Sequence, residues 1–212
     1  IKMSAEKISV LLLLAVIGSH AAPNASECDG LTKRLPTKDL NKIFRNWVLV
    51  WGVSDHETVE TLMPNVSSSH VEFKPLPDNK TFSYIERTIF HHNLSSCTTY
   101  FIKMTSCVLC PLLFLCVCVS GVEEDGKPVE YNDTGAVDFY ESCSDCLLLV
   151  YKGSRFRFVL SYTAHDDHKK VAECLGFPKK KPYVYDRVAG ECQPQHGEDN
   201  RTIGAQYWKK GQ

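Results

Sequence analysis

Hydrophobic residues in this chain fall into short runs, rich in β-branched and aromatic side chains and separated by Pro, Gly, Asn and Asp. Runs of this length and composition are typical of β-strands. In the run at 155–162, Phe156 and Phe158 share one face while Arg155 and Arg157 take the other, as in a strand with one buried face. The pattern predicts strands over residues 46–53, 69–76, 81–90, 97–105, 128–131, 136–140, 146–152 and 155–162.

One helix is expected after these strands, over about residues 164–175. Thr163 and Asp166 resemble a capping box at its start, and Gly176 with Pro178 would end it. Many short antiparallel strands followed by one helix predict a mostly β protein, with the helix packed on the wall of an up-and-down barrel or of a sandwich. Composition does not choose between these two.

The N-terminus has the pattern of a secretory signal peptide. Lys2 and Lys7 precede the apolar run 8–18, and Ser19 and Ala21 place small residues where a signal peptidase cleaves. A membrane anchor is the alternative, but the run is much shorter than the roughly 20 apolar residues that cross a bilayer. We expect a signal peptide over residues 1–21 and a single domain over residues 22–212.

Charge and cysteine content fit a secreted glycoprotein. With 24 Lys+Arg against 25 Asp+Glu, nothing indicates binding to nucleic acid or to an anionic membrane. The 10 cysteines suit an oxidising compartment in which thiols pair. Asn-X-Ser/Thr sequons lie between the apolar runs, where a bulky glycan is tolerated, and mark as glycosylation sites Asn24, Asn65, Asn79, Asn93, Asn132 and Asn200.

Several motifs carry a resemblance that covers nearly the whole mature chain. They are Asn46-Trp47 after Cys28, the Asn79-Lys80-Thr81 turn, Cys97 opening a strand, and the stretch 174–178 followed by 183–186 and Cys192. The chain resembles the alpha-1-acid glycoprotein group of lipocalins, and within it the fish lipocalins that bind saxitoxin, tetrodotoxin or tributyltin.

The resemblance implies a secreted plasma carrier, with an eight-stranded barrel that holds a small amphipathic or hydrophobic ligand in its calyx and needs no cofactor. It also implies the disulfides Cys28–Cys174 and Cys97–Cys192. By the chain-entropy model, each would stabilise the fold by about 4–5 kcal/mol. Oligomeric state is not indicated.

Trp47 matches the tryptophan of the lipocalin Gly-x-Trp signature, although Arg45 occupies the glycine position. We interpret Trp47 as a core residue at the closed end of the barrel rather than as a ligand contact. A period of two along the strands then gives as ligand-binding candidates Leu49, Trp51, Val71, Phe73, Phe82, Tyr84, Glu86, Phe156, Phe158 and Leu160.

Glu86 is the candidate that bears on ligand selectivity. An inward carboxylate in an apolar calyx would attract a cation, and the Tyr84 ring would offer a cation–π contact. An equally weighted alternative places Glu86 in water at the rim, because the phase of a strand is uncertain by one residue.

Two features depart from the family. Residues 106–120 are far more apolar than their surroundings and carry four cysteines, which we interpret as an insertion without function, such as a retained intron. The chain also passes from strand 155–162 almost directly into the helix, so we expect seven strands and an unpaired edge beside the first strand. In the alternative alignment, strand 155–162 is the eighth.

Cysteine spacing also raises the hypothesis of a zinc site. Cys107-x-x-Cys110 and Cys143-x-x-Cys146 have the spacing of a four-thiolate site, but secretion favours disulfides, and we expect no metal.

The sequence favours a carrier that is not an enzyme. Two alternatives remain open: a lipocalin-type isomerase with an inward cysteine thiolate, and an acute-phase plasma glycoprotein with no dedicated ligand.

Overall fold

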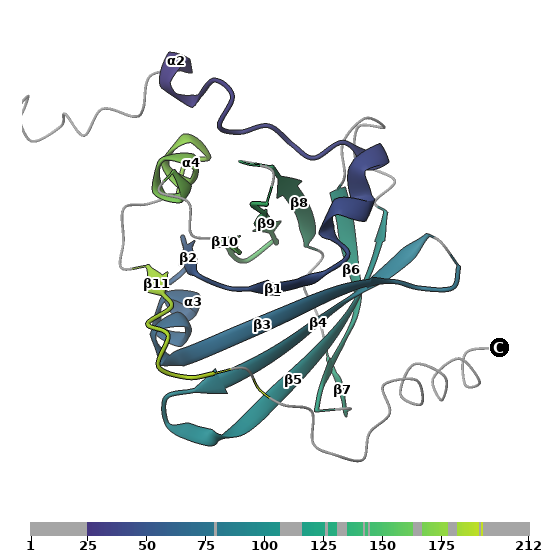
Figure 1. Cartoon of the computed structure of the whole chain (residues 1–212), viewed down its shortest axis with the longest axis vertical. Coiled ribbons are helices and arrows are strands. Elements are labelled where there is room, and N and C mark those ends of the chain that lie inside the picture. Colours follow the sequence, from purple (N-terminus) through teal and green to yellow (C-terminus); the bar gives the residue numbers. More distant parts are fainter. Residues whose placement is uncertain are drawn as a thin grey trace, which may run out of the picture.

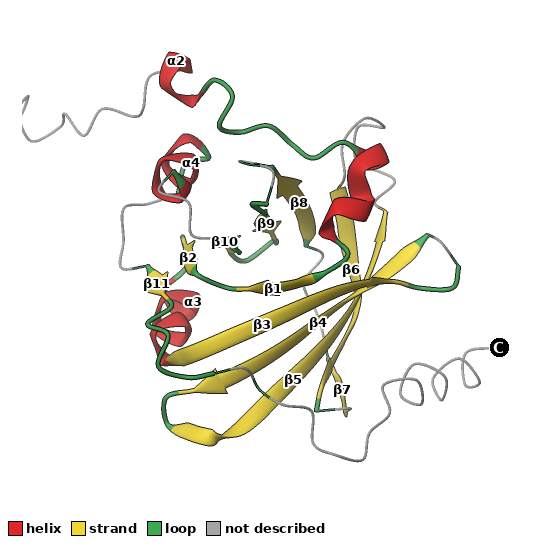
Figure 2. Cartoon of the chain, viewed as in Figure 1, coloured by secondary structure: helices red, strands yellow, loops and turns green. Residues whose placement is uncertain are grey.

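The computed structural model describes residues 25–78, 80–106, 116–125, 127–130, 135–141, 143, 145–162, 167–177, 182–190 and 192. One antiparallel sheet curls around a hydrophobic interior, and the helices lie outside it (Figures 1 and 2). The mostly β fold with one C-terminal helix is thereby confirmed. No helix among these residues has the length and apolar character needed to cross a membrane.

The strand order of the sheet is β1-β3-β4-β5-β6-β8-β9-β10-β2-β11, with β7 paired to β6. Neighbours along most of this path are consecutive in sequence, which is the up-and-down arrangement. The strands are β1 (Asn46–Val48), β2 (Trp51–Ser54), β3 (Val66–Pro75), β4 (Thr81–Phe90), β5 (Asn93–Ser106), β6 (Cys116–Glu124), β7 (Lys127–Val129), β8 (Ala136–Tyr140), β9 (Leu148–Lys152), β10 (Arg157–Ser161) and β11 (Tyr183–Val184).

Residues 46–54 supply the first strand of this path and its last but one. β1 pairs with β3, whereas β2 pairs with β10 and β11. Between them, the Leu49 N–H bonds to the Ser69 carbonyl at 2.9 Å and the Val50 N–H bonds to the Ser161 carbonyl at 2.9 Å. β1 and β2 do not pair with each other, yet one short stretch of chain connects β1, beside β3, to β2, beside β10.

The expected seven-strand barrel is wrong. β10 aligns with β2 over four residue pairs, from Phe158↔Ser54 to Ser161↔Trp51, so the edge beside the first strand is paired. The alternative alignment, with strand 155–162 as the last barrel strand, is the one observed.

Part of the apolar segment 106–120 forms strand. Ser106 ends β5, and residues 116–120 begin β6, which pairs with β5 and also, through Cys116–Cys118, with β8. Residues 107–115 lie outside the described residues, and the interpretation of the segment as an insertion stays a prediction.

The helices are short. They are α2 (Ala25–Cys28), the 3-10 helix η1 (Thr37–Ile43), α3 (Glu57–Leu62), the 3-10 helix η2 (Met63–Asn65) and α4 (His168–Cys174). α4 is the predicted C-terminal helix, and it ends before Gly176, whose φ of +77° suits a residue without a side chain. The expected capping residues 163 and 166 lie outside the described residues.

Buried apolar side chains form two clusters. The inner cluster fills the space that the sheet encloses and includes Trp47, Phe73, Phe82 and Phe139. The outer cluster lies between the sheet and α4, where Val171 and Ala172 of the helix meet β2, β9 and β10. The sheet is therefore covered on both faces where α4 packs.

Candidate functional site: an interior cavity with one carboxylate

One half of the sheet interior is solid. Phe139 packs edge-on against Phe73, with ring centroids 5.5 Å apart, and Phe82 packs against both rings. Leu35 and Ile43 close this end from outside the strands, and both are fully buried. We call this region the filled half.

Trp47 lies in the filled half, as expected of a core residue. Its indole N–H donates to the Ile43 carbonyl at 2.9 Å, and the Arg45 guanidinium lies 4.0 Å from the ring centroid. Arg45 thus covers the outer face of the indole.

The other half of the interior encloses a cavity of about 150 Å³, which we call the cavity half. A space of this size takes about one benzene-sized ring. Its walls are apolar apart from one carboxylate and the tyrosine hydroxyls, and they are formed by Tyr84, Glu86, Ile102, Met104, Val122, Val137, Leu149, Tyr151, Phe156, Phe158 and Leu160.

Three stacked rings form one wall of the cavity. Tyr151 of β9 and Phe158 of β10 lie 4.9 Å apart with 13° between their planes, and Phe156 stacks beside them. The three rings make this wall of the cavity aromatic and apolar.

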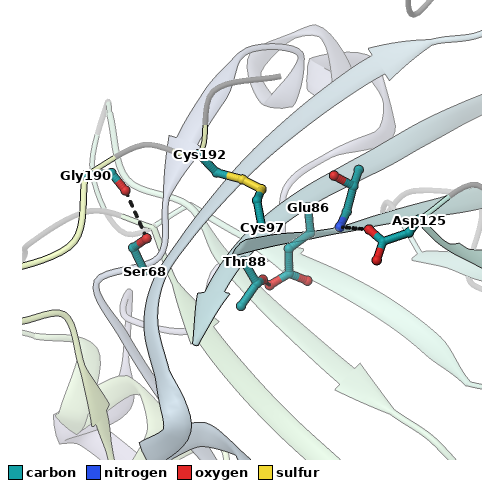
Figure 3. Close-up of a disulfide and its surroundings, with 8 residues drawn as sticks. Ser68, Glu86, Thr88, Cys97, Asp125, Gly190 and Cys192 are labelled. Carbon is teal, nitrogen blue, oxygen red and sulfur yellow. Dashed lines mark hydrogen bonds between the residues drawn. A yellow bond between two sulfur atoms is a disulfide. The ribbon is translucent and has the colours of Figure 1, made fainter. Parts of the chain in front are cut away.

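Glu86 lies on the opposite side of the interior. It belongs to β4, half-way round the strand order from β9. Its carboxylate is half-buried and accepts hydrogen bonds from Ser69 Oγ at 2.6 Å and Tyr84 Oη at 2.9 Å. Thr88 Oγ1 donates to the same group at 3.2 Å, and Figure 3 draws Thr88 and Glu86 together beside the Cys97–Cys192 disulfide. No ion pair among the described residues includes Glu86.

A directed chain of hydroxyls leads to Glu86. A carboxylate only accepts, so the Tyr84 hydroxyl donates to Glu86 and accepts from Tyr162, whose oxygen lies 3.2 Å away. Burial, with the Glu86 charge nearby, raises the pKa of Tyr84 well above its usual value, and burial raises that of Tyr162 as well. Both tyrosines therefore remain neutral donors at physiological pH.

The sequence identified part of this cavity. Among the predicted ligand-binding residues, those that line it are Tyr84, Glu86, Phe156, Phe158 and Leu160. Residues of the same predicted faces that lie in the inner cluster away from the cavity are Leu49, Val71, Phe73 and Phe82.

Trp51 was placed on the wrong face. It belongs to the outer cluster, and its ring lies 4.7 Å from His168 of α4. The period of two breaks between β1 and β2, so Gly52 faces Leu160 inside while Trp51 faces the helix. Trp51 therefore does not line the cavity.

Several cavity residues were missed. Ile102 and Met104 alternate along β5, and that pattern could have identified them. Leu149 and Tyr151 lie in a continuously apolar strand, in which both faces are covered and the pattern cannot distinguish inside from outside.

Three disulfides lie among the described residues, and two of them fasten a terminal segment. Cys28 pairs with Cys174 of α4, Cys97 of β5 pairs with Cys192, and Cys143 pairs with Cys146. The C-terminal segment is fastened again where Ser68 Oγ donates to the Gly190 carbonyl at 3.1 Å (Figure 3). The Cys143–Cys146 bond occupies two of the four sulfurs that the zinc hypothesis required.

Two of the sequon asparagines lie among the described residues. Asn65 follows α3 and Asn93 begins β5, and both are exposed. The His91 N–H bonds to the Asn65 carbonyl at 2.8 Å, so the two sites belong to adjoining loops at the end of the sheet near Phe156. Asn24, Asn79, Asn132 and Asn200 lie outside the described residues.

The chain is similar in sequence to two fish proteins. The chain is 35% identical over 205 residues to saxitoxin and tetrodotoxin-binding proteins 1 and 2 of Takifugu pardalis. This chain is a sequence relative of the fish toxin-binding proteins. The match covers 91% of the chain and 51% of each relative, so the chain spans about half the length of these toxin-binding relatives. The resemblance expected from the sequence is thereby confirmed, although no family model matches the chain.

Two solved structures align with the chain at low TM-scores and low sequence identity. The siderocalin Ex-FABP aligns with a TM-score of 0.47 at 6% identity, over 72% of this chain and 96% of the siderocalin. Lobster apocrustacyanin A1 aligns with a TM-score of 0.38 at 14% identity, over 66% of this chain and 71% of the crustacyanin.

Proposed function

We propose that the chain is a secreted carrier that holds a small amphipathic ligand in the cavity half, and that Glu86 makes it favour cations. The observation that carries the proposal is one half-buried carboxylate, without a cationic partner among the described residues, in a cavity whose other side is lined by aromatic rings. A buried carboxylate gains from an opposite charge, and the rings gain from the same cation.

The sequence relatives support the binding of a small ligand, and the disulfides and sequons support secretion. The toxin-binding relatives are named for small ligands, so saxitoxin, tetrodotoxin and, from the wider resemblance, an organotin are the first compounds to test. Disulfides and the sequons of a glycoprotein accord with secretion. A thiolate isomerase gains no support, because the six cysteines with described side chains are all paired.

The experiment begins with protein from a eukaryotic secretory host, with its disulfides intact. Mass spectrometry of what co-purifies, and titration with a saxitoxin-like guanidinium compound, an organotin and a steroid, should reveal a ligand bound at micromolar concentration or tighter. Phe158→Ala should weaken that binding by about 1–3 kcal/mol through lost apolar contact.

Phe101→Ala is the matched control, because Phe101 precedes Ile102 on β5 and faces away from the cavity. Its effect on affinity should be negligible. Equal losses in both variants, or no binding of any compound by the folded protein, would refute the carrier function.

A further inference from the structure

A short disulfide closes the turn between β8 and β9. Cys143 and Cys146 are three residues apart in the sequence, whereas the other two disulfides among the described residues join positions 146 and 95 residues apart. The Cys146 N–H also donates to the Cys143 carbonyl at 3.2 Å. A backbone hydrogen bond therefore closes the same turn, which does not depend on the disulfide alone.

Non-covalent contacts hold both flanks of this turn. Before it, the Glu141 carboxylate pairs with Lys42 at 3.0 Å. After it, the Tyr162 N–H donates to the Leu147 carbonyl at 3.0 Å. A bond that closes a short loop also restricts the unfolded chain least. Opening this bond should therefore disturb the fold less than opening either long-range disulfide.

The two cysteines of the turn differ in their access to solvent. Cys143 is half-buried, whereas Cys146 is buried, with 7% of its surface exposed. A disulfide opens when a thiolate attacks one of its sulfurs, and access helps to decide which sulfur is attacked. An external thiol therefore reaches Cys143, and Cys146 becomes the leaving group.

Arg45 is the cation placed to pair with a thiolate at Cys146. Both residues line one small hollow, together with Lys42 and Glu141, which pair with each other. Arg45 pairs instead with Asp145 at 3.1 Å, and the Asp145 side chain is 76% exposed. An exposed ion pair contributes little to stability, so Arg45 can leave Asp145 at small cost. A neighbouring cation lowers the pKa of a thiol in general and makes it a better leaving group.

We propose that Cys143–Cys146 is an exchange site for low-molecular-weight thiols. The thiolate of the incoming thiol attacks Sγ of Cys143, the S–S bond breaks, and its electron pair leaves on Sγ of Cys146, beside Arg45. The products are a mixed disulfide at Cys143 and a free thiol at Cys146. A second molecule of thiol then yields two cysteine thiols and the oxidised thiol dimer, whereas return of Cys146 restores the original bond. The inference does not depend on ligand binding in the cavity.

The first test locates the mixed disulfide. The full disulfide-bonded protein, with any free thiols already blocked, is treated with reduced glutathione at neutral pH without denaturant and is then quenched with N-ethylmaleimide. Peptide mapping of the singly glutathionylated product should show glutathione on Cys143 and N-ethylmaleimide on Cys146. When half of this bond has reacted, less than a tenth of Cys28–Cys174 and of Cys97–Cys192 should have opened. Glutathione mainly on Cys146, or equal opening of all three disulfides, would overturn the proposal.

A matched pair of variants tests the direction of attack. Cys146→Ser leaves a thiol at the half-buried position, and Cys143→Ser leaves one at the buried position. With oxidised glutathione, Cys146→Ser should form a mixed disulfide at least tenfold faster than Cys143→Ser. Equal rates or the reverse order would contradict the assignment of Cys143 as the attacked sulfur.

Arg45→Gln tests the charge beside the leaving sulfur. It should slow the opening of Cys143–Cys146 at least threefold, whereas Arg45→Lys, which keeps the charge, should remain within twofold of the unsubstituted protein. A turn loosened by the substitution would open faster, so a packing effect has the opposite sign. An unchanged or faster rate in Arg45→Gln would overturn the role of Arg45.

Discussion

The filled half and the cavity half are built from the same sheet and the same alternating pattern, yet only the cavity half contains space that side chains leave unfilled. In the filled half, Phe73 and Phe139 meet at 77°, and such edge-to-face contacts interlock. In the cavity half, Tyr151 and Phe158 lie nearly parallel along one wall and leave the space before them open. Both halves are apolar, so hydrophobicity alone does not distinguish the region that can hold a ligand, and the packing of the rings does.

The largest expected difference between the halves is in stability. Phe139→Ala removes a ring with no exposed surface and should lower the free energy of unfolding by about 3–5 kcal/mol. Phe158→Ala borders existing empty space and should cost less. Chemical denaturation of both variants, with their disulfides intact, measures this, and equal losses would show that the two halves are packed alike.

Gly135 should control the size of the cavity. A Cβ at this position would overlap the hydroxyl end of Tyr151, so Gly135→Ala forces the ring away from the stack with Phe158. We expect a loss of about 1–3 kcal/mol in stability from overpacking, together with about tenfold weaker ligand binding. Gly190→Ala has open space around it and is the control. Unchanged binding in Gly135→Ala would mean that Tyr151 does not shape the site.

Tryptophan fluorescence can distinguish the faces of the sheet. Trp51 lies between the sheet and α4, outside the cavity, so Trp51→Phe should leave any ligand-induced change in emission intact. Trp47 lies in the inner cluster but does not line the cavity, so we expect its contribution to that change to be small. If the ligand-induced change in emission is lost in Trp51→Phe, Trp51 must lie close to the ligand, which would contradict its position outside the cavity.

The smallest expected effect is on folding stability at low pH, through the ion pair between Asp55 and Arg157 at the start of β10. Burial alone would raise the pKa of Asp55, but hydrogen bonds from Arg157 lower it below its ordinary 3.8. Because the folded pKa is the lower one, the stabilisation is present above the ordinary pKa and is lost as pH falls through the folded value. Both side chains are partly exposed, so the contribution should be below about 1 kcal/mol. Asp55→Asn should remove this dependence, as measured by thermal melts from pH 6 to about pH 2.

Strong local patterns made much of the fold predictable. Thr81–Phe90 and Ala136–Tyr140 begin and end as predicted, because turn residues flank an alternating or β-branched sequence. β11 was not predicted, since two residues carry no periodicity and their pairing with β2 depends on the tertiary fold.

The site was less predictable than the strands. Alternation placed Tyr84 and Glu86 on the inner face, but it could not show that Phe73 would be packed solid while Phe158 borders space. It also carried the phase of Trp47 through to Trp51, although the strand changes partner between them. Packing geometry and strand breaks are tertiary features that a single sequence does not display.

Glu86→Gln is the substitution that tests the central claim most directly. Glutamine keeps the size of the side chain but removes the negative charge of the cavity. Calorimetric titration with N,N-dimethylbenzylammonium and isobutylbenzene, its neutral isostere, should show the cation binding the unsubstituted protein at least tenfold tighter than the neutral compound. In Glu86→Gln, the cation should lose that advantage while isobutylbenzene binds as before. An advantage that survives in folded Glu86→Gln would contradict the account, because another group would then have to attract the charge.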